Sequence, residues 1–548
     1  MHKWSIMLPG AASALLFAAC AAPTAPAPTG QTGDSSGQPK SGGAMTVRIA
    51  NDPFDWDLSY VGKSIPNGDG QAFIYSSLLG FKSGPTVKYD ELILEPELAD
   101  KWTVSPDGKT FTFNLRPGVK FADKAPVNGR ALTATDVKWS YEYWSRTGEF
   151  KDKKLPTAQF AWMFDGVQSV EAPNANTVVV RFEEPYAPFL NYAASDFNPV
   201  VPREIYDKDG HLKNMNAGSG PFQLDEANSQ KGSKWILKKN PTYFEPGKPY
   251  LDEIRWLVIP DDSTASAAFR TKQLDILGGS GRLGLQQSQD VIKAVPNATH
   301  FEYSDPAPMH FYINARKKPL EDVRVRRAMA YAIDPDEFIK VLFQGKGRRA
   351  MAGVFPDAFT QDEIKAIQKF DLAESKKLLA EAGFANGLEL EFIFPGKSYG
   401  EAYITSMELL QAQLKKAGIN MTLKSQEKAV ESEAKKTGDY TLTHTSKSLE
   451  SDVDSYLFNV FHPSSKGNYG GTNDPALTEL LLSQRREIDP KKRMEIVKQA
   501  GKRIYDQAHA LALYAGVQYQ HWHPYVKNYG PNFGGTGWPL TDVWIDGR

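Results

Sequence analysis

The segment 371–424 constrains the fold most, because it indicates two strands joined by a helix through short links. Residues 388–394 and 419–423 carry the apolar and alternating patterns of strands, and residues 401–417 form an amphipathic helical pattern. Strand, helix and strand in this order make a right-handed βαβ unit, whose two strands lie parallel in one sheet. We therefore predict an α/β fold with a parallel or mixed sheet in this part of the chain.

Capping signals mark further helices on both sides of this unit. Asp371 precedes a helix that carries Glu374 three residues later, and Gly383 ends it. Asp474 and Asp489 each precede a proline, the arrangement of an N-cap before the first helical turn. Elsewhere we expect strands at 45–50, 177–182 and 273–277, a hairpin across 102–115, and helices at 72–79, 135–143, 475–486 and 490–508.

Length and charge narrow the class of protein. A chain of 548 residues exceeds what one hydrophobic core supports, so we expect at least two lobes. The 64 Lys and Arg residues nearly balance 65 Asp and Glu residues, which leaves no excess of positive charge for nucleic acid phosphates. The single cysteine excludes an intramolecular disulfide and a cysteine metal cluster. No P-loop, H-E-x-x-H or C-x-x-C motif is present, and we expect no cofactor.

Residues 1–20 indicate a secretion signal that ends at the only cysteine. Trp4 to Ala19 form an apolar run too short to span a bilayer, and the small residues before Cys20 resemble a bacterial lipobox. In a lipobox the thiol takes a diacylglyceryl group, so we expect Cys20 to anchor the protein in a membrane. Residues 21–44 are rich in Pro, Thr, Ser and Gly and predict a disordered tether. The alternative is an ordinary signal peptide.

One motif suggests an enzyme. Gly396-Lys-Ser398-Tyr-Gly400 matches the G-x-S-x-G elbow of α/β hydrolases and lies between a strand and a helix, as that elbow does. Its partners would be Asp439 or Asp452, followed by His462 or His509. A glycine-rich turn is the simpler interpretation, because no oxyanion segment of the HGGG type precedes it. We assign no catalytic residue and keep a hydrolase using Ser398 as an alternative.

Two other patterns carry less information. Gly279-Ser-Gly281-Arg-Leu-Gly284 matches a dinucleotide-binding fingerprint but lies in the middle of the chain, and a connecting loop is the simpler interpretation. His521 and His523 are close enough to face one side of a strand, yet no third ligand stands at metal-binding spacing. We therefore predict no metal site.

Three spaced segments resemble the family-5 extracellular solute-binding proteins, the oligopeptide- and dipeptide-binding components of bacterial ABC importers. The first runs from Glu95-Pro-Glu-Leu-Ala-Asp-Lys-Trp102 through Ser105 to Phe121 and closes on Leu132-Thr-Ala-Thr-Asp136-Val137. The second is Gly218-Ser-Gly-Pro-Phe222, and the third is Asp322-Val-Arg-Val-Arg-Arg-Ala-Met-Ala-Tyr-Ala-Ile-Asp334. The resemblance extends from about Met45 to the end of the chain.

The resemblance implies a fold like that of the type II periplasmic binding proteins, with two lobes, a hinge and an inserted small domain. Lobe I would collect 45–88, 214–303 and 518–548, the inserted domain would span 89–213, and lobe III would span 304–517. It also implies a monomer that captures a solute between the lobes and delivers it unchanged to the membrane subunits of an ABC permease. A sensory or chaperone role for the same fold is a further alternative.

The resemblance favours a short peptide as the solute. In peptide-binding relatives an acidic residue after a lobe III strand pairs with the α-ammonium group. Counting forward from the strand at 440–444 places Glu450 there, whereas counting back from Ser455 places Leu449 there; Asp452 lies in the same stretch. Lys428 stands where such relatives carry an aromatic residue, so a sugar, an opine or a metal chelate is the alternative solute. By position, the other candidates for the cleft are Trp56, Tyr60, Asn67, Asn314 and Trp538.

Overall fold

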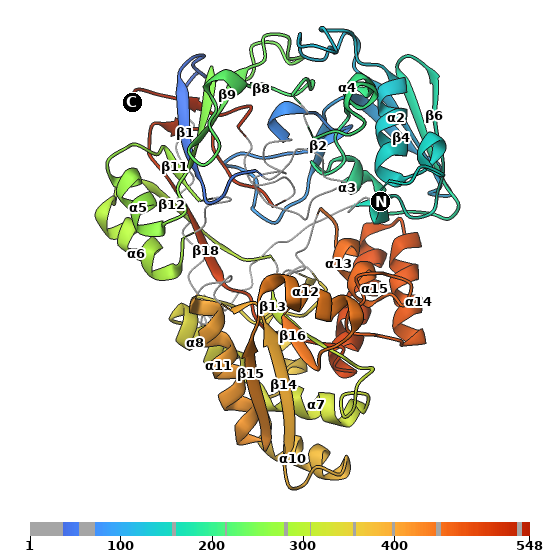
Figure 1. Cartoon of the computed structure of the whole chain (residues 1–548), viewed down its shortest axis with the longest axis vertical. Helices are drawn as coiled ribbons and strands as arrows, with labels where there is room; N and C mark the ends of the chain where they lie inside the picture. Colours follow the sequence, from blue (N-terminus) through green and yellow to red (C-terminus); the bar gives the residue numbers. More distant parts are fainter. Residues whose placement is uncertain are drawn as a thin grey trace, which may run out of the picture.

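The structure is a computed structural model that describes residues 37–53, 72–155, 160–213, 216–278, 283–306, 308–354, 358–396, 401–444, 451–533 and 540–548. Its strands group into three main sheets that lie in separate parts of the molecule (Figure 1). We call these parts lobe I, the inserted domain and lobe III. None of the helices in the described ranges is long and apolar enough to cross a membrane.

Lobe I is built on a seven-stranded mixed sheet whose strands come from distant parts of the chain. β1 lies near its middle, parallel to both β10 and β11, with Val47 opposite Trp256 and Ile276. From one edge to the other the order is β12 (Thr299–Ser304), β18 (Val517–Trp522), β11 (Ile276–Leu277), β1 (Ala44–Ile49), β10 (Glu253–Val258), β9 (Lys234–Lys239) and β8 (Phe222–Leu224). Lobe I also holds α5 (Asp262–Arg270), α6 (Leu285–Ala294), the turn η3 (Glu226–Asn228) and the short pairs β2 (Leu79–Phe81) with β3 (Leu94–Pro96) and β19 (Val526–Lys527) with β20 (Trp544–Ile545).

The inserted domain is a four-stranded antiparallel sheet covered by helices. Its order is β4 (Ala99–Val104), β5 (Thr110–Leu115), β7 (Thr177–Phe182) and β6 (Val167–Asn174), and the predicted hairpin is confirmed as β4 and β5. Its helices are α2 (Ala134–Ser145), α3 (Phe189–Ala193), α4 (Arg203–Asp209), η1 (Gly148–Phe150) and η2 (Ala161–Phe164).

Lobe III contains the predicted βαβ unit. β14 (Leu388–Phe394) runs parallel to β15 (Ile419–Ser425) and to β16 (Leu442–His444), and α11 (Glu401–Lys416) joins the first pair. β13 (Met309–Ile313) and β17 (Ala510–Tyr514) complete the five-stranded sheet in antiparallel fashion. The other helices are α7 (Val323–Ala332), α8 (Pro335–Phe343), α9 (Gln361–Ile367), α10 (Leu372–Glu381), α12 (Lys428–Thr437), α13 (Asp454–Phe461), α14 (Pro475–Arg486) and α15 (Pro490–Asp506).

Apolar packing divides the molecule into two bodies. One cluster of buried side chains joins lobe I to the inserted domain, since Trp256 and Ile254 belong to the same cluster as Phe111, Tyr141 and Phe189. The buried members of the two clusters in lobe III all come from residues between 311 and 514. Lobe III is therefore a separately packed body, which is what a hinge between two lobes requires.

Two short crossovers connect these bodies. One leads from β12 in lobe I to β13 in lobe III, and the other returns from β17 to β18. They lie side by side, because the backbone N–H of Asp305 donates to the carbonyl of Gly516 at 2.8 Å. A few residues in two adjacent strands of chain form the geometry of a hinge.

Two predicted boundaries in lobe I were wrong. Of the helix expected at 72–79, only residues 72–74 are helical; Ser76 then bridges Val200, and β2 begins at Leu79. The backbone here pairs with the inserted domain and with the Gly218–Gly220 stretch, and this pairing overrides local helix preference. The strand expected at 273–277 is confined to Ile276–Leu277, because the chain bends at residues 273 and 275 before it.

Candidate functional site

The carboxyl ends of the parallel strands in lobe III face lobe I. α10 precedes β14 and lies at the far end of lobe III, whereas α12 follows β15 and lies at the end nearer lobe I (Figure 1). Ligands of open α/β sheets bind outside the carboxyl ends of the strands. The candidate site is therefore the region between this sheet edge and lobe I.

Polar side chains are buried at this edge, around the end of β16. The hydroxyl of Thr443 donates to Glu431 Oε1 at 3.0 Å, and Lys435 Nζ lies 2.9 Å from the same oxygen. The two charged side chains are only 2% and 7% exposed, so each charge has its partner inside the protein. Burial, with the Lys435 ammonium added, lowers the pKa of His444 well below its ordinary value. This imidazole is neutral at physiological pH.

A second buried histidine lies on β13. His310 Nδ1 lies 2.8 Å from the carbonyl of Pro308, and its Nε2 meets the hydroxyl of Tyr456 on α13. Burial lowers the pKa of His310 to about 4. The hydroxyl of Tyr456 therefore donates to a neutral ring, and the pair joins β13 to α13 next to the candidate site.

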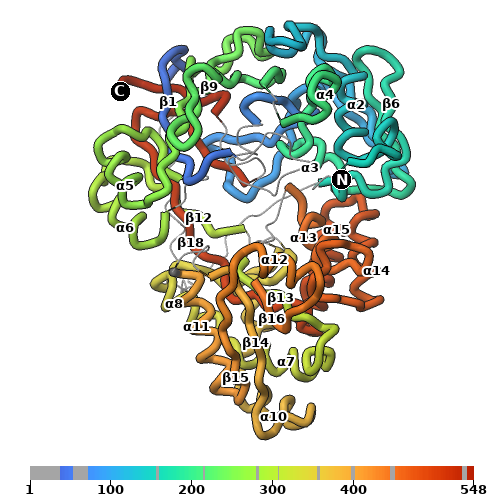
Figure 2. Tube along the Cα trace, viewed as in Figure 1, coloured from blue at the N-terminus to red at the C-terminus, as the bar shows by residue number. Residues whose placement is uncertain are grey.

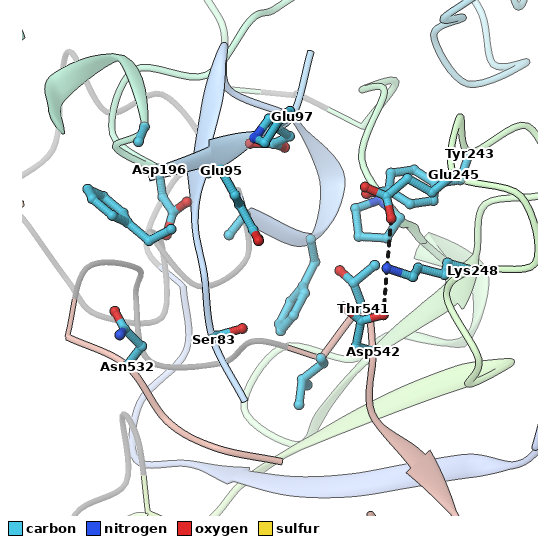
Figure 3. Close-up of a pocket in the computed structure, with 18 residues that line it drawn as sticks. Ser83, Glu95, Glu97, Asp196, Tyr243, Glu245, Lys248, Asn532, Thr541 and Asp542 are labelled. Atoms are coloured by element: carbon cyan, nitrogen blue, oxygen red, sulfur yellow. Dashed lines mark ion pairs between the residues drawn. The ribbon is translucent and has the colours of Figure 1, made fainter. Parts of the chain in front are cut away.

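An acidic pocket of about 230 Å³ opens between lobe I and the inserted domain (Figure 3). Five carboxyl groups surround it, from Glu95, Glu97, Asp196, Glu245 and Asp542. The cation in its wall, Lys248, lies 2.9 Å from Glu245 and 2.6 Å from Asp542. Burial, with repulsion from Asp196 added, raises the pKa of Glu97 well above its ordinary value. The excess of acceptor oxygens favours a cationic or hydrogen-bond-donating group.

Asp452 lies where lobe III meets the inserted domain. Its carboxylate accepts two bonds from Arg493, at 2.6 and 2.8 Å, and one from Asn191 Nδ2 of the inserted domain at 2.9 Å. Burial acts to raise the pKa of Asp452, but Arg493 outweighs burial and holds it below its ordinary value. Asp452 is therefore an ionised group whose two oxygens bond within the protein.

Asn314, another predicted cleft residue, lies in lobe III just after β13 and is 1% exposed. Its Nδ2 donates to the carbonyls of Gly438 and Tyr440, and its Oδ1 accepts from Arg316. These bonds tie β13 to the segment before β16. The remaining predicted residues lie outside the described ranges: Cys20, Trp56, Tyr60, Asn67, Leu449, Glu450 and Trp538.

Comparison with known proteins gives the family. Residues 94–468 match the model of the bacterial extracellular solute-binding proteins, family 5. The chain belongs to this family. As a member it is an extracytoplasmic solute-binding protein of the ABC importer type and not an enzyme. The suggestion of a hydrolase is therefore set aside.

Relatives of this solute-binding protein bind different solutes. It is 28% identical to the dipeptide-binding protein of Escherichia coli K12 over 87% of its own length and 88% of the relative's. It is 26% identical to heme-binding protein A of Haemophilus influenzae over 95% of both chains. Its fold matches the ABC transporter-associated periplasmic binding protein DppA from Helicobacter pylori in complex with peptide STSA, with a TM-score of 0.76, 24% identity and coverage of 93% and 99%.

The hydrolase partners weighed from sequence have other roles in this solute-binding protein. His509 Nε2 lies 3.1 Å from Asp474, Asp439 pairs with Lys317 at 2.9 Å, and His462 Nδ1 bonds to the hydroxyl of Ser464. Ser398 itself lies outside the described ranges. Local structural contacts therefore account for these polar groups.

The glycine and histidine patterns also find structural explanations where they are described. His521 Nδ1 lies 2.9 Å from His300 Nδ1, and His523 Nε2 bonds to the carbonyl of Phe269. Within the described ranges no group of three or more His, Cys, Asp and Glu residues is arranged to hold a metal ion. Of the fingerprint glycines, Gly279 and Gly281 lie outside the described residues, while Gly284 caps α6.

Sequence reasoning missed two groups of this solute-binding protein. The acidic pocket escaped it because its five carboxyl groups come from four separate segments, and only Glu95 and Glu97 belong to a recognised motif. Asn191 and Tyr192 also escaped it. Nothing in the sequence near them indicates that they meet a partner about 260 residues further along the chain, since only the folded chain brings them together.

Proposed function

We propose that this solute-binding protein captures a short peptide between its two bodies and delivers it to an ABC permease. The observation that carries the proposal is the match to a dipeptide-binding protein over nearly nine-tenths of both chains. The acidic pocket in one of these bodies is a second support, because a peptide with a free amino end carries a cationic group that carboxylates attract.

A cleft that captures a peptide without changing it must provide partners for the charged ends of the peptide. Closing a cleft around a peptide removes its charged ends from water, so each end needs a partner of opposite charge. We propose that Glu450 pairs with the α-ammonium group. The described chain stops at His444, the end of β16, and resumes at Ser451, so Glu450 follows a strand whose carboxyl end faces lobe I.

The test is native mass spectrometry of the protein after incubation with a mixed library of di- to hexapeptides. We expect a retained ligand of intact peptide mass. Glu450→Gln should weaken retention at least tenfold, because a buried ammonium group would lose its counter-charge. Glu433→Gln is the matched control, since Glu433 is an exposed carboxylate on α12 of the same lobe and should retain peptide normally.

The possible results separate the alternatives. No retained peptide, or a co-purified non-peptide mass, would move the solute to another class, as the match to a heme-binding protein allows. Peptide retained equally by Glu450→Gln would keep the function but remove Glu450 from the site.

We also propose that Cys20 carries a lipid that holds the protein at the membrane surface. The support is the lipobox-like end of the signal segment and the Pro- and Gly-rich residues 21–44 after it. Cys20→Ser should release the protein from the membrane fraction of the producing cell and remove the diacylglyceryl mass. Unchanged membrane association of Cys20→Ser would contradict lipid anchoring.

A further inference from the structure

The contact between the inserted domain and lobe III contains buried hydrogen bonds and an ion pair, although each side is built on an apolar core. It lies across the molecule from the crossovers at β12 and β18, where α3 approaches α13 (Figure 2). The buried apolar cluster that joins lobe I to the inserted domain does not continue into lobe III. A polar contact of this kind can separate and re-form, because water replaces its hydrogen bonds on opening.

Two carboxylates of lobe III form the centre of this contact, and an arginine of the same lobe holds each of them. Arg493 donates two hydrogen bonds to Asp452, and Arg485 donates two to Asp454, at 2.8 and 2.9 Å. Asp452 and Asp454 are 2% and 0% exposed. Bidentate pairing fixes the direction of each carboxylate before the other body arrives.

Neighbouring residues of the inserted domain complete both pairs. Asn191 Nδ2 donates to Asp452 Oδ2 at 2.9 Å, and the hydroxyl of Tyr192 donates to Asp454 Oδ2 at 3.1 Å. The two donors are adjacent on α3. Of the two acceptors, Asp454 begins α13 and Asp452 lies two residues before it. Both bonds cross the same contact, so separation of the two bodies would break both of them.

Arg485 extends the contact beyond its carboxylate. Its carbonyl accepts from the backbone N–H of Ala187 at 2.7 Å, and its Nη1 lies 3.2 Å from Asp165. Its guanidinium lies 3.2 Å from the ring centre of Phe458 in lobe III and 5.4 Å from that of Tyr186 in the inserted domain. The side chain and backbone of this one residue of lobe III therefore meet three residues of the other body.

We propose that Asn191 and Tyr192 are positioning residues for solute capture, which hold the cleft closed by bonding to Asp452 and Asp454. They act on the balance between open and closed forms and so on the apparent affinity, because a solute that binds the closed form gains from every contact that favours that form. This inference needs the hinge but not the identity of the solute.

The test measures the distance between the two bodies in protein freed of solute by unfolding and refolding. Spin labels are placed by Lys208→Cys on α4 and Glu495→Cys on α15, both exposed, in the full chain carrying Cys20→Ser. Pulsed electron paramagnetic resonance then gives the ratio of short to long distances between the two labels. Asn191→Ala with Tyr192→Phe should raise the long-distance fraction, relative to the short one, by about tenfold or more, because two bonds to charged groups are lost.

Tyr525→Phe is the matched control. It removes a buried bond of the same kind, from Tyr525 to Asp275 at 2.7 Å, but both partners lie in lobe I. It should lower the melting temperature and leave the distance ratio unchanged. A double variant whose distances equal those of the parent and of Tyr525→Phe would overturn the proposal.

A milder variant protects the test against misfolding. Asp165 is 42% exposed, so Asp165→Asn weakens one bond to Arg485 without disturbing the core. It should shift the same ratio in the same direction by a smaller factor. If the double variant does not fold, an unchanged ratio in Asp165→Asn overturns the proposal, and an increased long-distance fraction supports it.

Discussion

His310 shows how burial of a single residue makes stability depend on pH. In the folded protein burial lowers its pKa to about 4, whereas an exposed histidine in the unfolded chain has a value near 6.5. Between these two values the unfolded chain binds more protons than the folded one. The free energy of unfolding must therefore fall as the pH falls from 6.5 to 4.

We predict that His310→Gln removes about 3 kcal/mol of this pH dependence, at 1.36 kcal/mol per pKa unit. Glutamine keeps an acceptor for the hydroxyl of Tyr456 but does not titrate in this range. The measurement is urea unfolding of variant and parent at pH 7 and at pH 4. Other buried histidines titrate in both proteins, so the result is the difference between variant and parent in how much the free energy of unfolding changes from pH 7 to pH 4. An equal change in both proteins would contradict the assignment.

Asp136 gives a residue-level reason for part of the family motif. Its carboxylate accepts from the backbone N–H of Thr133 at 2.8 Å, closing a capping box at the start of α2, and it also pairs with Arg130 at 2.7 Å. We predict that Asp136→Ala lowers the free energy of unfolding by about 2 kcal/mol, since it removes one half of the capping box and one of the two carboxylates that pair with Arg130.

The check for Asp136 is chemical denaturation beside Asp261→Ala. Asp261 is the N-cap of α5 and accepts from Thr264 N–H at 2.7 Å, whereas Asp136 is the N3 residue of its helix; Asp261 is exposed at the surface. The Asp261 change should cost less than the Asp136 change, because water can replace the bonds of an exposed cap. If Asp136→Ala costs no more than Asp261→Ala, the pairing with Arg130 adds nothing.

At the scale of elements, the motif Gly218-Ser-Gly-Pro-Phe222 is explained by close approach of two backbones. A Cβ atom on Gly218 would stand 1.9 Å from the carbonyl oxygen of Ile74, and one on Gly220 would stand 2.6 Å from the carbonyl carbon of Ile74. The atoms that would clash with the added Cβ are backbone atoms, which cannot move aside as the end of a flexible side chain can. The segment at 72–79 is held in this position, and not as a helix, by that approach.

We predict that Gly218→Ala destabilises lobe I by about 3 kcal/mol, the upper end for overpacking in a core. Gly80→Ala is the control, because its added Cβ would meet nothing closer than 3.6 Å. Differential scanning calorimetry should show a lower melting temperature for the first variant and none or a small change for the second. Equal melting temperatures would contradict the steric reason.

Elements were predictable where the pattern is local. Strand 388–394, helix 401–417 and the proline-led helices after Asp474 and Asp489 are decided by neighbours in sequence, and the structure has them within two residues or less at each end. The prediction of a helix at 72–79 was wrong because contacts with residues far along the chain set the conformation of this segment. The site is distributed in the same way: the acidic pocket and the Asn191–Asp452 bond join segments that no local pattern connects.

At the scale of the whole molecule, the separation of cores predicts which parts fold alone. The chain enters lobe III after β12 and leaves it before β18, through crossovers that lie side by side. The two ends of lobe III are therefore close together. Its buried apolar residues come from within it. On excision it loses the polar contact with the inserted domain, which water can replace, and the packing of one lobe I side chain, Phe533. The inserted domain differs, because it shares one buried cluster with lobe I.

We predict that residues 305–516, produced alone, fold into a body with mixed α/β circular dichroism and a cooperative thermal transition. Residues 89–213, produced in the same way, should lack a cooperative transition, because excision exposes apolar side chains that share one buried cluster with lobe I in the intact protein. The comparison controls for excision itself. Cooperative unfolding of both segments would show that the inserted domain folds without lobe I. If residues 305–516 alone do not fold, the two bodies depend on each other for folding as well as for closing.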